Sequence, residues 1–333
     1  MSASASSPAA SSSSQSGETA ARQPSAYARE IDLLLVLYLA VIVCAILYPA
    51  SFLSLDNLRV ILNNLAIDGI LAIGMMGLMI AGVFDLSVGS MMSLAGVVAG
   101  WLMVKLGWPV PAAVAAALAT AALGGLANGL LVATAGVNAL ITTLATLGIF
   151  QGLAILLGGP GIVDLPESFC WLGQKELLRL QLPVWFMLGL ALVAHYALRH
   201  TRYLRQLYYL GSNPQAARLS GIDVERLQVV AFVLMGLIAG VAGLAFAARV
   251  GTSVSTAGVG AELRVITAVI LGGASLKGGK GSVAGALVGV LFMALINNVL
   301  IIARVSSYWQ SIVVGVVLIL AVGLDSWQNR GRR

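Results

Sequence analysis

The sequence predicts an all-α, polytopic membrane protein with about ten transmembrane segments. Of its 333 residues, 59% are hydrophobic and only 10% are charged, and the mean hydropathy is +0.96. A soluble domain is about 45–50% apolar and about 25% charged, so this chain could not cover its surface with polar groups in water. Apolar runs close to the ~20 residues that cross a bilayer recur along the chain. The 38 glycines are typical of helices that approach closely in lipid.

The apolar runs divide the chain into its expected elements. Residues 1–26 are rich in Ser and Ala without apolar periodicity, so we expect a disordered cytoplasmic tail there. A transmembrane domain is expected over 27–326, followed by a basic cytoplasmic tail over 327–333. The expected membrane segments are 31–48, 58–82, 88–105, 109–133, 138–157, 183–199, 227–247, 263–276, 282–303 and 308–324. The eighth is too short for a straight span and continues into the glycine-rich stretch 272–282, which predicts a broken or re-entrant region.

The distribution of Lys and Arg predicts that both termini are cytoplasmic. If the N-terminus lies inside and all ten segments cross, most of the 19 basic residues are cytoplasmic. They are Arg22, Arg29, Arg199, Arg202, Arg205, Arg218, Arg226, Lys277, Lys280, Arg330, Arg332 and Arg333. The opposite orientation would export them, against the positive-inside rule. The net charge of +6 therefore reflects orientation in the lipid and does not predict a nucleic-acid partner.

One basic segment, 205–226, interrupts the apolar pattern with a short predicted helix. Ser212 or Asn213 can cap this helix, Pro214 suits its first turn, and Gly221 can end it in the left-handed conformation. A helix of about two turns is unstable alone, so it has to pack against its own membrane domain or against a partner. The residues by themselves leave open an ordinary charged loop and a docking element.

The stretch FDLSVGS places an acid between two apolar segments. We expect Asp85 to cap the following helix by accepting from the backbone N–H of Val88, with Ser87 and Gly89 in a tight turn. Direct contact with a solute is the alternative, because an intramembrane acid is a candidate functional group. If the second and third segments simply alternate, this turn faces the cytoplasmic side.

Several polar residues lie inside the predicted membrane segments. Asn64 and Asp68 are four residues apart and share one helix face. Polar side chains in lipid turn toward other helices, so these residues either join helices or line a solute pathway. The same two interpretations apply to Asn128, Thr142, Thr143, Thr146, Gln151, Asn297 and Asn298. Asp68 is also the main candidate if the protein is an ion-coupled secondary transporter, which needs ion-binding or proton-relaying groups near the midplane.

The stretch GGASLKGGKGS does not fit a nucleotide-binding loop. Ala274 and Gly281 stand where a P-loop requires Gly and Ser or Thr, and no βα unit surrounds them. Close packing and a helix break are expected at Gly272, Gly273, Ser275, Gly278, Gly279 and Gly281. The chain lacks a Ser-His-Asp set, an HExxH motif and paired catalytic carboxylates. We therefore expect no enzyme activity, no metal and no cofactor bound by this chain.

Four motifs resemble the permease subunits of ATP-driven (ABC) importers, in particular the ribose-type branch. QAARLSG keeps the spacing of their EAA-x-x-x-G loop, with Gln215 in place of Glu, and FDLSVGS resembles their GGIDLSVGS turn. NALITTLATLGIFQGL resembles their TLG segment, and VITAVILGGASLKGGKGSVAGALVG is similar to their C-terminal glycine-rich motif. The resemblance extends from about residue 30 to about residue 325. Val83-Phe84 and Asn138-Ala139 depart from the usual Gly-Ile and Pro-Phe, so the usual substrate need not apply.

The resemblance implies a multi-pass protein of a bacterial inner membrane that moves a sugar or a sugar-like polyol into the cytoplasm by alternating access. It implies cytosolic ATPase subunits, a second permease copy or a paralogue, an extracytoplasmic solute-binding protein and membrane lipid as partners. ATP is then used by the partner ATPase alone. The residues expected to couple to that ATPase are Asn213, Gln215, Ala216, Ala217, Arg218 and Gly221. The related permeases for branched-chain amino acids and an ion-coupled transporter stay as alternatives.

Overall fold

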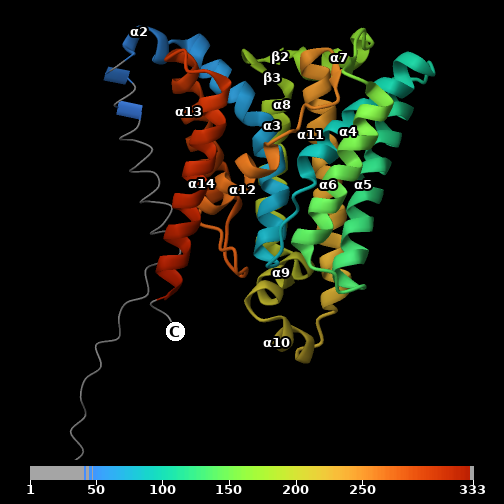
Figure 1. The fold of residues 1–333 in the computed structure, drawn as a ribbon, viewed down its shortest axis with the longest axis vertical. Coiled ribbons are helices and arrows are strands. Elements are labelled where there is room, and N and C mark those ends of the chain that lie inside the picture. The colour runs from blue at the N-terminus through green and yellow to red at the C-terminus, as the bar shows by residue number, and fades with distance from the viewer. Residues whose placement is uncertain (1–40, 43–44, 47, 331–333) are drawn as a thin grey trace, which may run out of the picture.

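The computed structural model describes residues 41–42, 45–46 and 48–330 of the chain, and this part is an α-helical bundle (Figure 1). Seven of its helical segments are long and apolar enough to cross a membrane. They are α3 (Leu55–Ile80), α4 (Val88–Gly100) continued by η1 (Trp101–Lys105), α5 (Val110–Ala133), α6 (Ala139–Gly158), α8 (Leu182–His200), α11 (Val224–Val250) and α13 (Val283–Ile302). The prediction of an all-α polytopic membrane protein is confirmed.

Three of the ten expected segments are not among these seven. The first, 31–48, lies mostly outside the described residues, as does the whole expected tail 1–26. Two others correspond to α12 (Ala261–Leu271), which has 11 residues, and to α14 (Ser307–Arg330), whose apolar part is Tyr308–Gly323. The basic tail expected over 327–333 begins inside α14, and its last three residues are not described. The count of ten crossings stays a prediction.

The remaining elements are short. They are α2 (Pro49–Phe52), β1 (Gly161–Ile162), α7 (Glu167–Gln174), β2 (Glu176–Leu177), β3 (Leu180–Gln181), α9 (Arg202–Ser212), α10 (Pro214–Leu219) and β4 (Ser253–Val254). β1 pairs antiparallel with β4, and β2 pairs antiparallel with β3. Figure 1 shows α7, β2 and β3 at one end of the bundle and α9 and α10 at the other. We name these the α7 end and the α10 end.

Helix α11 packs against α4 and α5 through glycines. A β-carbon at Gly236 would collide with the carbonyl oxygen of Ala121, and one at Gly125 with that of Phe232. A β-carbon at Gly243 would likewise collide with the carbonyl of Met92. Small residues of this kind let helix backbones approach closely in lipid, where no hydrophobic effect drives the helices together. We call Gly125, Gly236 and Gly243 the glycine seam.

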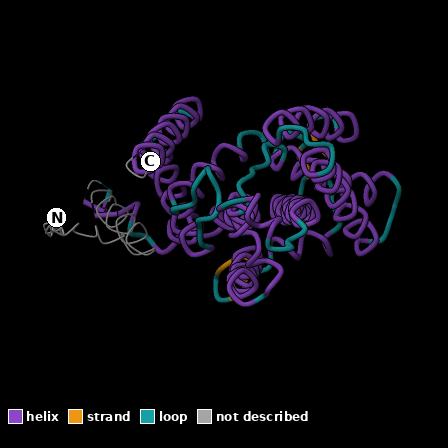
Figure 2. The backbone as a smooth tube through the Cα atoms, turned by 90° about the horizontal axis from the view of Figure 1, so that it is seen from below, coloured by secondary structure: helices purple, strands orange, loops and turns teal. Residues whose placement is uncertain are grey.

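Helices α3 and α4 have the most buried side chains among the seven long helices. On the side of α3 away from α5, α12 and α13 pack against it, and α14 packs against α12. Figures 1 and 2 both place α14 at one edge of the bundle. The protein therefore has a compact block around α11 and a thinner layer formed by α12, α13 and α14.

The connector between α3 and α4 leads from the α10 end into the bundle. Its start lies at the α10 end, where the N–H of Gly279 donates to the carbonyl of Ile80 at 2.8 Å. The connector then turns into the bundle, because Asp85 and Ser87 are 2% and 1% exposed and contact Asn128 inside α5. The acid of the FDLSVGS turn is therefore buried in the bundle, and the side of the membrane that the turn faces stays a prediction.

Candidate functional site

The short helix expected in 205–226 is present as α10. The side chain of Asn213 caps it, since its Oδ1 accepts from the backbone N–H groups of Gln215 at 3.1 Å and Ala216 at 3.0 Å. Ser212, the other possible cap, instead donates its hydroxyl to the carbonyl of Tyr208 at 2.7 Å. Gly221 comes just after the helix with a φ of +81°, the left-handed conformation that the sequence predicts.

One of the expected coupling residues of α10 is buried, and a residue outside that set is exposed. Ala217 is buried at 3% exposure and packs on the main core, whereas Leu219 is 91% exposed. Residues two apart on a helix point to nearly opposite sides, so burial of Ala217 turns Leu219 outward. Arg218 forms an ion pair with Glu225 in the first turn of α11. Ala217 therefore anchors α10 to the bundle, and Leu219, which sequence reasoning missed, lies on the exposed face.

The glycine-rich loop 272–282 touches the stem of this coupling segment. A β-carbon at Gly211, the next-to-last residue of α9, would collide with the carbonyl of Ile80 and lie 2.5 Å from the nitrogen of Gly279. A β-carbon at Gly278 would lie 2.6 Å from the Cα of Gly82. We call Gly82, Gly211, Gly278 and Gly279 the glycine joint, because α3, α9 and the loop meet there backbone to backbone.

A tyrosine on α9 strengthens this joint. The hydroxyl of Tyr208 donates to the carbonyl of Gly281 at 3.0 Å. Burial raises the pKa of Tyr208, so the phenol keeps the proton that it donates. The loop thus holds the last turn of α9 through both a side-chain bond and close backbone contact.

The remaining residues of the glycine-rich motif serve the loop itself. Gly272 and Gly285 let α12 and α13 approach, since a β-carbon on either would collide with the other's carbonyl. Gly273 has a φ of +91° with nothing within 4 Å of a β-carbon. The hydroxyl oxygen of Ser275 accepts from the N–H of Lys277 at 3.3 Å. The chain is irregular from Gly272 to Ser282, as the glycines predict.

Asp85 forms a buried polar cluster with Ser87 and Asn128. Its Oδ1 accepts from the N–H of Ser87 at 2.7 Å and from the Ser87 hydroxyl at 2.6 Å. The amide of Asn128 donates to Asp85 at 3.3 Å and to the Ser87 oxygen at 2.9 Å. The expected bond to Val88 is wrong, because the carboxylate takes the N–H two residues on, as in an Asx-turn. Gly89 comes next, in close backbone contact with Gly258.

A polar stripe runs along the half of α3 that leads from the α7 end to the middle of the helix. Asn57, Asn64 and Asp68 are separated by seven and four residues, so they share one face. Each bonds a different helix. Asn57 and Asn298 of α13 exchange two amide hydrogen bonds at 2.6 and 3.1 Å. Arg249 of α11 donates from Nη2 to Asn64 at 2.8 Å.

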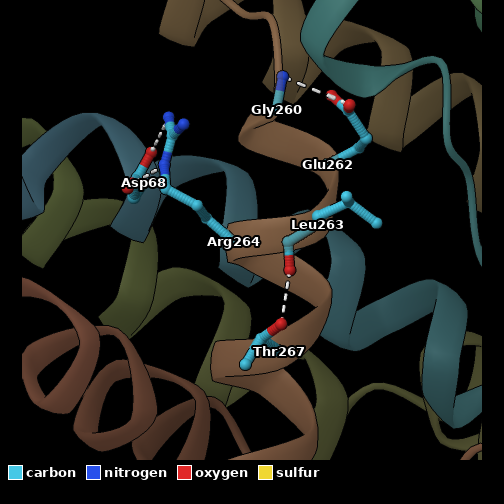
Figure 3. Close-up of polar contacts among 6 residues, drawn as sticks. All are labelled: Asp68, Gly260, Glu262, Leu263, Arg264 and Thr267. Carbon is cyan, nitrogen blue, oxygen red and sulfur yellow. Dashed lines mark hydrogen bonds and ion pairs between the residues drawn. The ribbon is translucent and has the colours of Figure 1, made fainter. Parts of the chain in front are cut away.

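The stripe ends in an ion pair between α3 and α12 (Figure 3). Arg264 donates from Nε and from Nη2 to the two carboxylate oxygens of Asp68, both at 3.3 Å. Glu262, in the first turn of α12, accepts from the N–H of Gly260 at 3.2 Å. The hydroxyl of Thr267 donates to the carbonyl of Leu263 within α12. Asp68, the residue considered for ion coupling, therefore has a cationic partner.

Sequence reasoning missed the charged residues that complete this stripe. Arg249, Glu262 and Arg264 lie at the ends of apolar runs, where a charge is ordinary. The sequence offered one indication of these contacts. Charged residues lie between two membrane segments, and an acid that needs a partner lies in the middle of α3. Contacts between residues 185 and 196 positions apart do not follow from local spacing.

Thr143 and Gln151, two further candidate pathway residues, make hydrogen bonds within the protein. Thr143 is fully buried and donates to the carbonyl of Ala139 within its own helix. Gln151 donates to the carbonyl of Ser255 at 2.8 Å. Asn298 is 6% exposed, and Asn297 is half-buried. Of the residues predicted for the pathway, the structure brings Asn64, Asp68 and Asn298 into the α3 stripe and places Asp85, Ser87 and Gly89 in a separate cluster.

The known proteins most informative for this fold are membrane permeases. Residues 57–322 match the family described as the permease component of the branched-chain amino acid transport system. The chain belongs to this family. The matched part of the permease includes the α3 stripe, α10 and the glycine-rich loop.

Individual relatives cover nearly all of this permease. It is 40% identical over 308 residues to the ribose import permease protein RbsC of Escherichia coli. The matched region covers 90% of this chain and 95% of that protein. It is 36% identical over 282 residues to RbsC of Haemophilus influenzae, spanning 83% and 87% of the two chains. The autoinducer 2 import system permease protein LsrC of Salmonella paratyphi B is 35% identical over 292 residues, spanning 86% and 84%. No solved structure matches the chain.

Proposed function

We propose that this permease is the membrane subunit of an ATP-driven importer that carries a sugar or a sugar-like polyol. The support is the similarity, over more than four fifths of both chains, to permeases named for ribose import and autoinducer 2 import. The family description mentions branched-chain amino acids, but the two ribose import permeases favour a hydroxyl-rich solute. The permease itself supplies the route, and a partner ATPase hydrolyses ATP.

The coupling role is supported by the structure and position of α10. It projects at the α10 end with Leu219 almost fully exposed, while Ala217 and the Asn213 cap fix its orientation. An exposed leucine on a rigid, capped helix suits a groove on a soluble partner. We place the α10 end in the cytoplasm, together with both termini, because the basic residues of 205–226 lie there.

The proposed mechanism passes motion of the ATPase through the glycine joint. Closure of an ATPase dimer on ATP displaces α10 and the end of α9. Gly211 transmits this displacement directly to the end of α3 and to the loop 272–282, because their backbones are in contact. Coupling requires different contacts in the two states, and exchange of Arg218 from Glu225 to an ATPase acidic group would provide one.

The proposed orientation, with the α10 end in the cytoplasm, also indicates where the other partners bind. α7 and the β2–β3 hairpin lie at the opposite end, where they can receive an extracytoplasmic binding protein. A second copy of this permease or a paralogue completes the route. In this proposal the segment 31–48 and α14 also cross the bilayer, and α12 with the loop 272–282 forms a broken crossing from the α7 end to the α10 end.

The coupling role is tested by tagged co-purification of the ATPase from native membranes. Leu219→Glu places a charge on the exposed tip of α10 and should abolish recovery of the ATPase with the permease. The matched control is Leu178→Glu, which changes a leucine that is 78% exposed in the β2–β3 turn at the other end. The control should recover the ATPase as wild type does. Equal recovery of the ATPase with both variants would show that α10 is not part of the coupling interface.

The energy source and the solute are tested by uptake. Sugar uptake into sealed vesicles with a cognate binding protein should continue in the presence of an ionophore as long as ATP is supplied. Loss of uptake on adding the ionophore, with ATP intact, would establish the ion-coupled alternative. Uptake of leucine without uptake of D-ribose would establish the amino-acid alternative.

A further inference from the structure

The two halves of α3 differ sharply along one face. From the α7 end to the middle, this face carries Asn57, Asn64 and Asp68, each bonded to another helix. The same face then continues as Ala72, Met75 and Met79, which are at most 2% exposed. The polar stripe therefore stops abruptly at Asp68, and the rest of this face belongs to a closed apolar core.

The ion pair at the end of the stripe lies at the middle of the membrane. Asp68 is the fourteenth of the 26 residues of α3, so it is about 20 Å from either end of the helix. That position corresponds to the midplane of a hydrocarbon core roughly 30 Å thick. Yet the side chains of Arg264 and Asp68 are 31% and 27% exposed. Charged groups at this depth face the bundle interior or a water-filled cavity and avoid lipid.

The backbone next to Arg264 supports a water-filled surface. Residues 255–260 before α12 and 272–282 after it are not helical, so α12 is a short helix between two irregular segments. Irregular backbone at membrane depth is tolerated where it is buried in protein or lines a water-filled cavity, and broken helices mark solute sites in transporters. Asn64, one turn before Asp68 on the same face of α3, is itself exposed.

We propose that the stripe from Asn57 to the Asp68–Arg264 pair lines the outer half of the solute route, and that this ion pair is its floor. This inference rests on the proposed transport function and adds the residues of the route. The site takes a neutral, hydroxyl-rich solute. Asp68 and Arg264 neutralise each other, so a charged solute would have to break the pair. Hydroxyl groups can accept from the remaining guanidinium N–H groups and donate to the carboxylate without breaking it.

The chemistry of the stripe also suits passage. Amide and ion-pair groups that already bond one another bind a hydroxyl weakly, and a transported solute has to leave each site. The closed core formed by Met75 and Met79 blocks the inner half in this conformation. Opening of that half is the step that motion of α10 would drive through the end of α3.

Water access to the stripe is measured with cysteine probes in a background carrying Cys44→Ser and Cys170→Ser. Asn64→Cys, at an exposed position of the stripe, reports on the proposed route. Leu192→Cys is the matched control, because Leu192 lies near the middle of α8 and is 73% exposed. A membrane-impermeant methanethiosulfonate should modify the first probe at least tenfold faster than the second, while a lipid-soluble maleimide should modify both. Equal protection of both probes from the impermeant reagent would overturn the proposal.

The role of the ion pair is measured with two impermeant methanethiosulfonates of opposite charge. At Asn64→Cys the trimethylammonium-ethyl and sulfonatoethyl reagents should react at similar rates relative to a free thiol. Added Asp68→Asn should shift the rate ratio about threefold or more toward the anionic reagent, and Arg264→Gln should shift it by a similar factor toward the cationic one. An unchanged ratio in both variants would show that the pair does not face the route.

The same preparations separate this inference from the proposed function. If the ATPase co-purifies but the Asn64→Cys probe is inaccessible to water, the route lies elsewhere and the importer assignment stands. If the probe is accessible but no ATPase is recovered with wild type, the water-filled route stands and the coupling proposal fails.

Discussion

The glycine seam and the glycine-rich loop use the same residue for opposite reasons. In the seam, Gly125 and Gly236 have ordinary helical backbones, and a β-carbon on either would collide with the neighbouring helix. In the loop, Gly273 has a φ of +91° and open space around a β-carbon. The seam needs the small size of glycine, and the loop needs its backbone freedom. The glycine joint needs both, since Gly278 combines a φ of +85° with close contact to Gly82.

This difference separates a fixed part of the molecule from a part suited to movement. Helices that touch backbone to backbone over several turns have few alternative arrangements, so we expect α4, α5 and α11 to move as one block. An irregular loop can change its dihedral angles with little loss of packing. The glycine joint connects that loop to α9, which is where motion from α10 would enter. Substitutions at the three kinds of glycine test this division.

The largest effect is expected in the seam. Gly236→Leu forces a side chain into the carbonyl of Ala121, so α5 and α11 have to separate. We expect a loss of roughly 3 kcal/mol or more and little folded protein. The measurement is the yield and the thermal midpoint of the detergent-solubilised permease. The matched control is Gly148→Leu on α6, where a β-carbon meets nothing within 4 Å. Similar losses in both variants would contradict a special role for the seam.

The next largest effect is expected at the glycine joint. Gly211→Ala places a methyl group against the backbone of Ile80 and Gly279, so the end of α9 has to shift. We expect a loss of about 1–3 kcal/mol, and ATP hydrolysis by the assembled complex that no longer drives uptake. The control is Gly77→Ala, about one turn before Ile80 in α3, where the added methyl meets nothing. Normal coupling in Gly211→Ala would show that this contact does not transmit motion.

The parts of this structure that could be predicted from the sequence are those set by local pattern. Apolar runs predicted the seven long helices, and the order Asn213, Pro214 and Gly221 predicted α10 and both of its ends. Each depends on residues that are close along the chain. For the same reason the glycine-rich stretch predicted an irregular loop between α12 and α13.

The parts that could not be predicted depend on which helices become neighbours. The partner of Asp68 is Arg264, 196 residues away, and spacing within one helix does not indicate it. A six-residue helix has too few turns to show which face is buried, so buried Ala217 was included among the expected coupling residues and exposed Leu219 was overlooked. An acid between two apolar segments has the same local pattern at a membrane surface and inside a bundle, so the contact of Asp85 with Asn128, 43 residues away, could not be predicted.

A smaller effect is expected where only backbone freedom matters. At Gly273 the left-handed conformation costs an alanine about 1–2 kcal/mol, whereas asparagine tolerates it better. Gly273→Ala should therefore lower the thermal midpoint more than Gly273→Asn, although asparagine is larger. Space around the position excludes a collision as the cause. The reverse order of the two variants would indicate that size limits this position, as it does in the seam.

The smallest effect is expected at glycines that are helical and open. Gly152 lies in the middle of α6, and a β-carbon there meets nothing within 4 Å. Gly152→Ala should raise the stability of the permease by about 0.5–1 kcal/mol, because alanine loses less backbone freedom than glycine on forming a helix. The thermal midpoint of the purified subunit measures this. A gain in the separated subunit combined with a loss in the assembled importer would show that this face of α6 packs against another chain, and that a second glycine seam forms only in the complex.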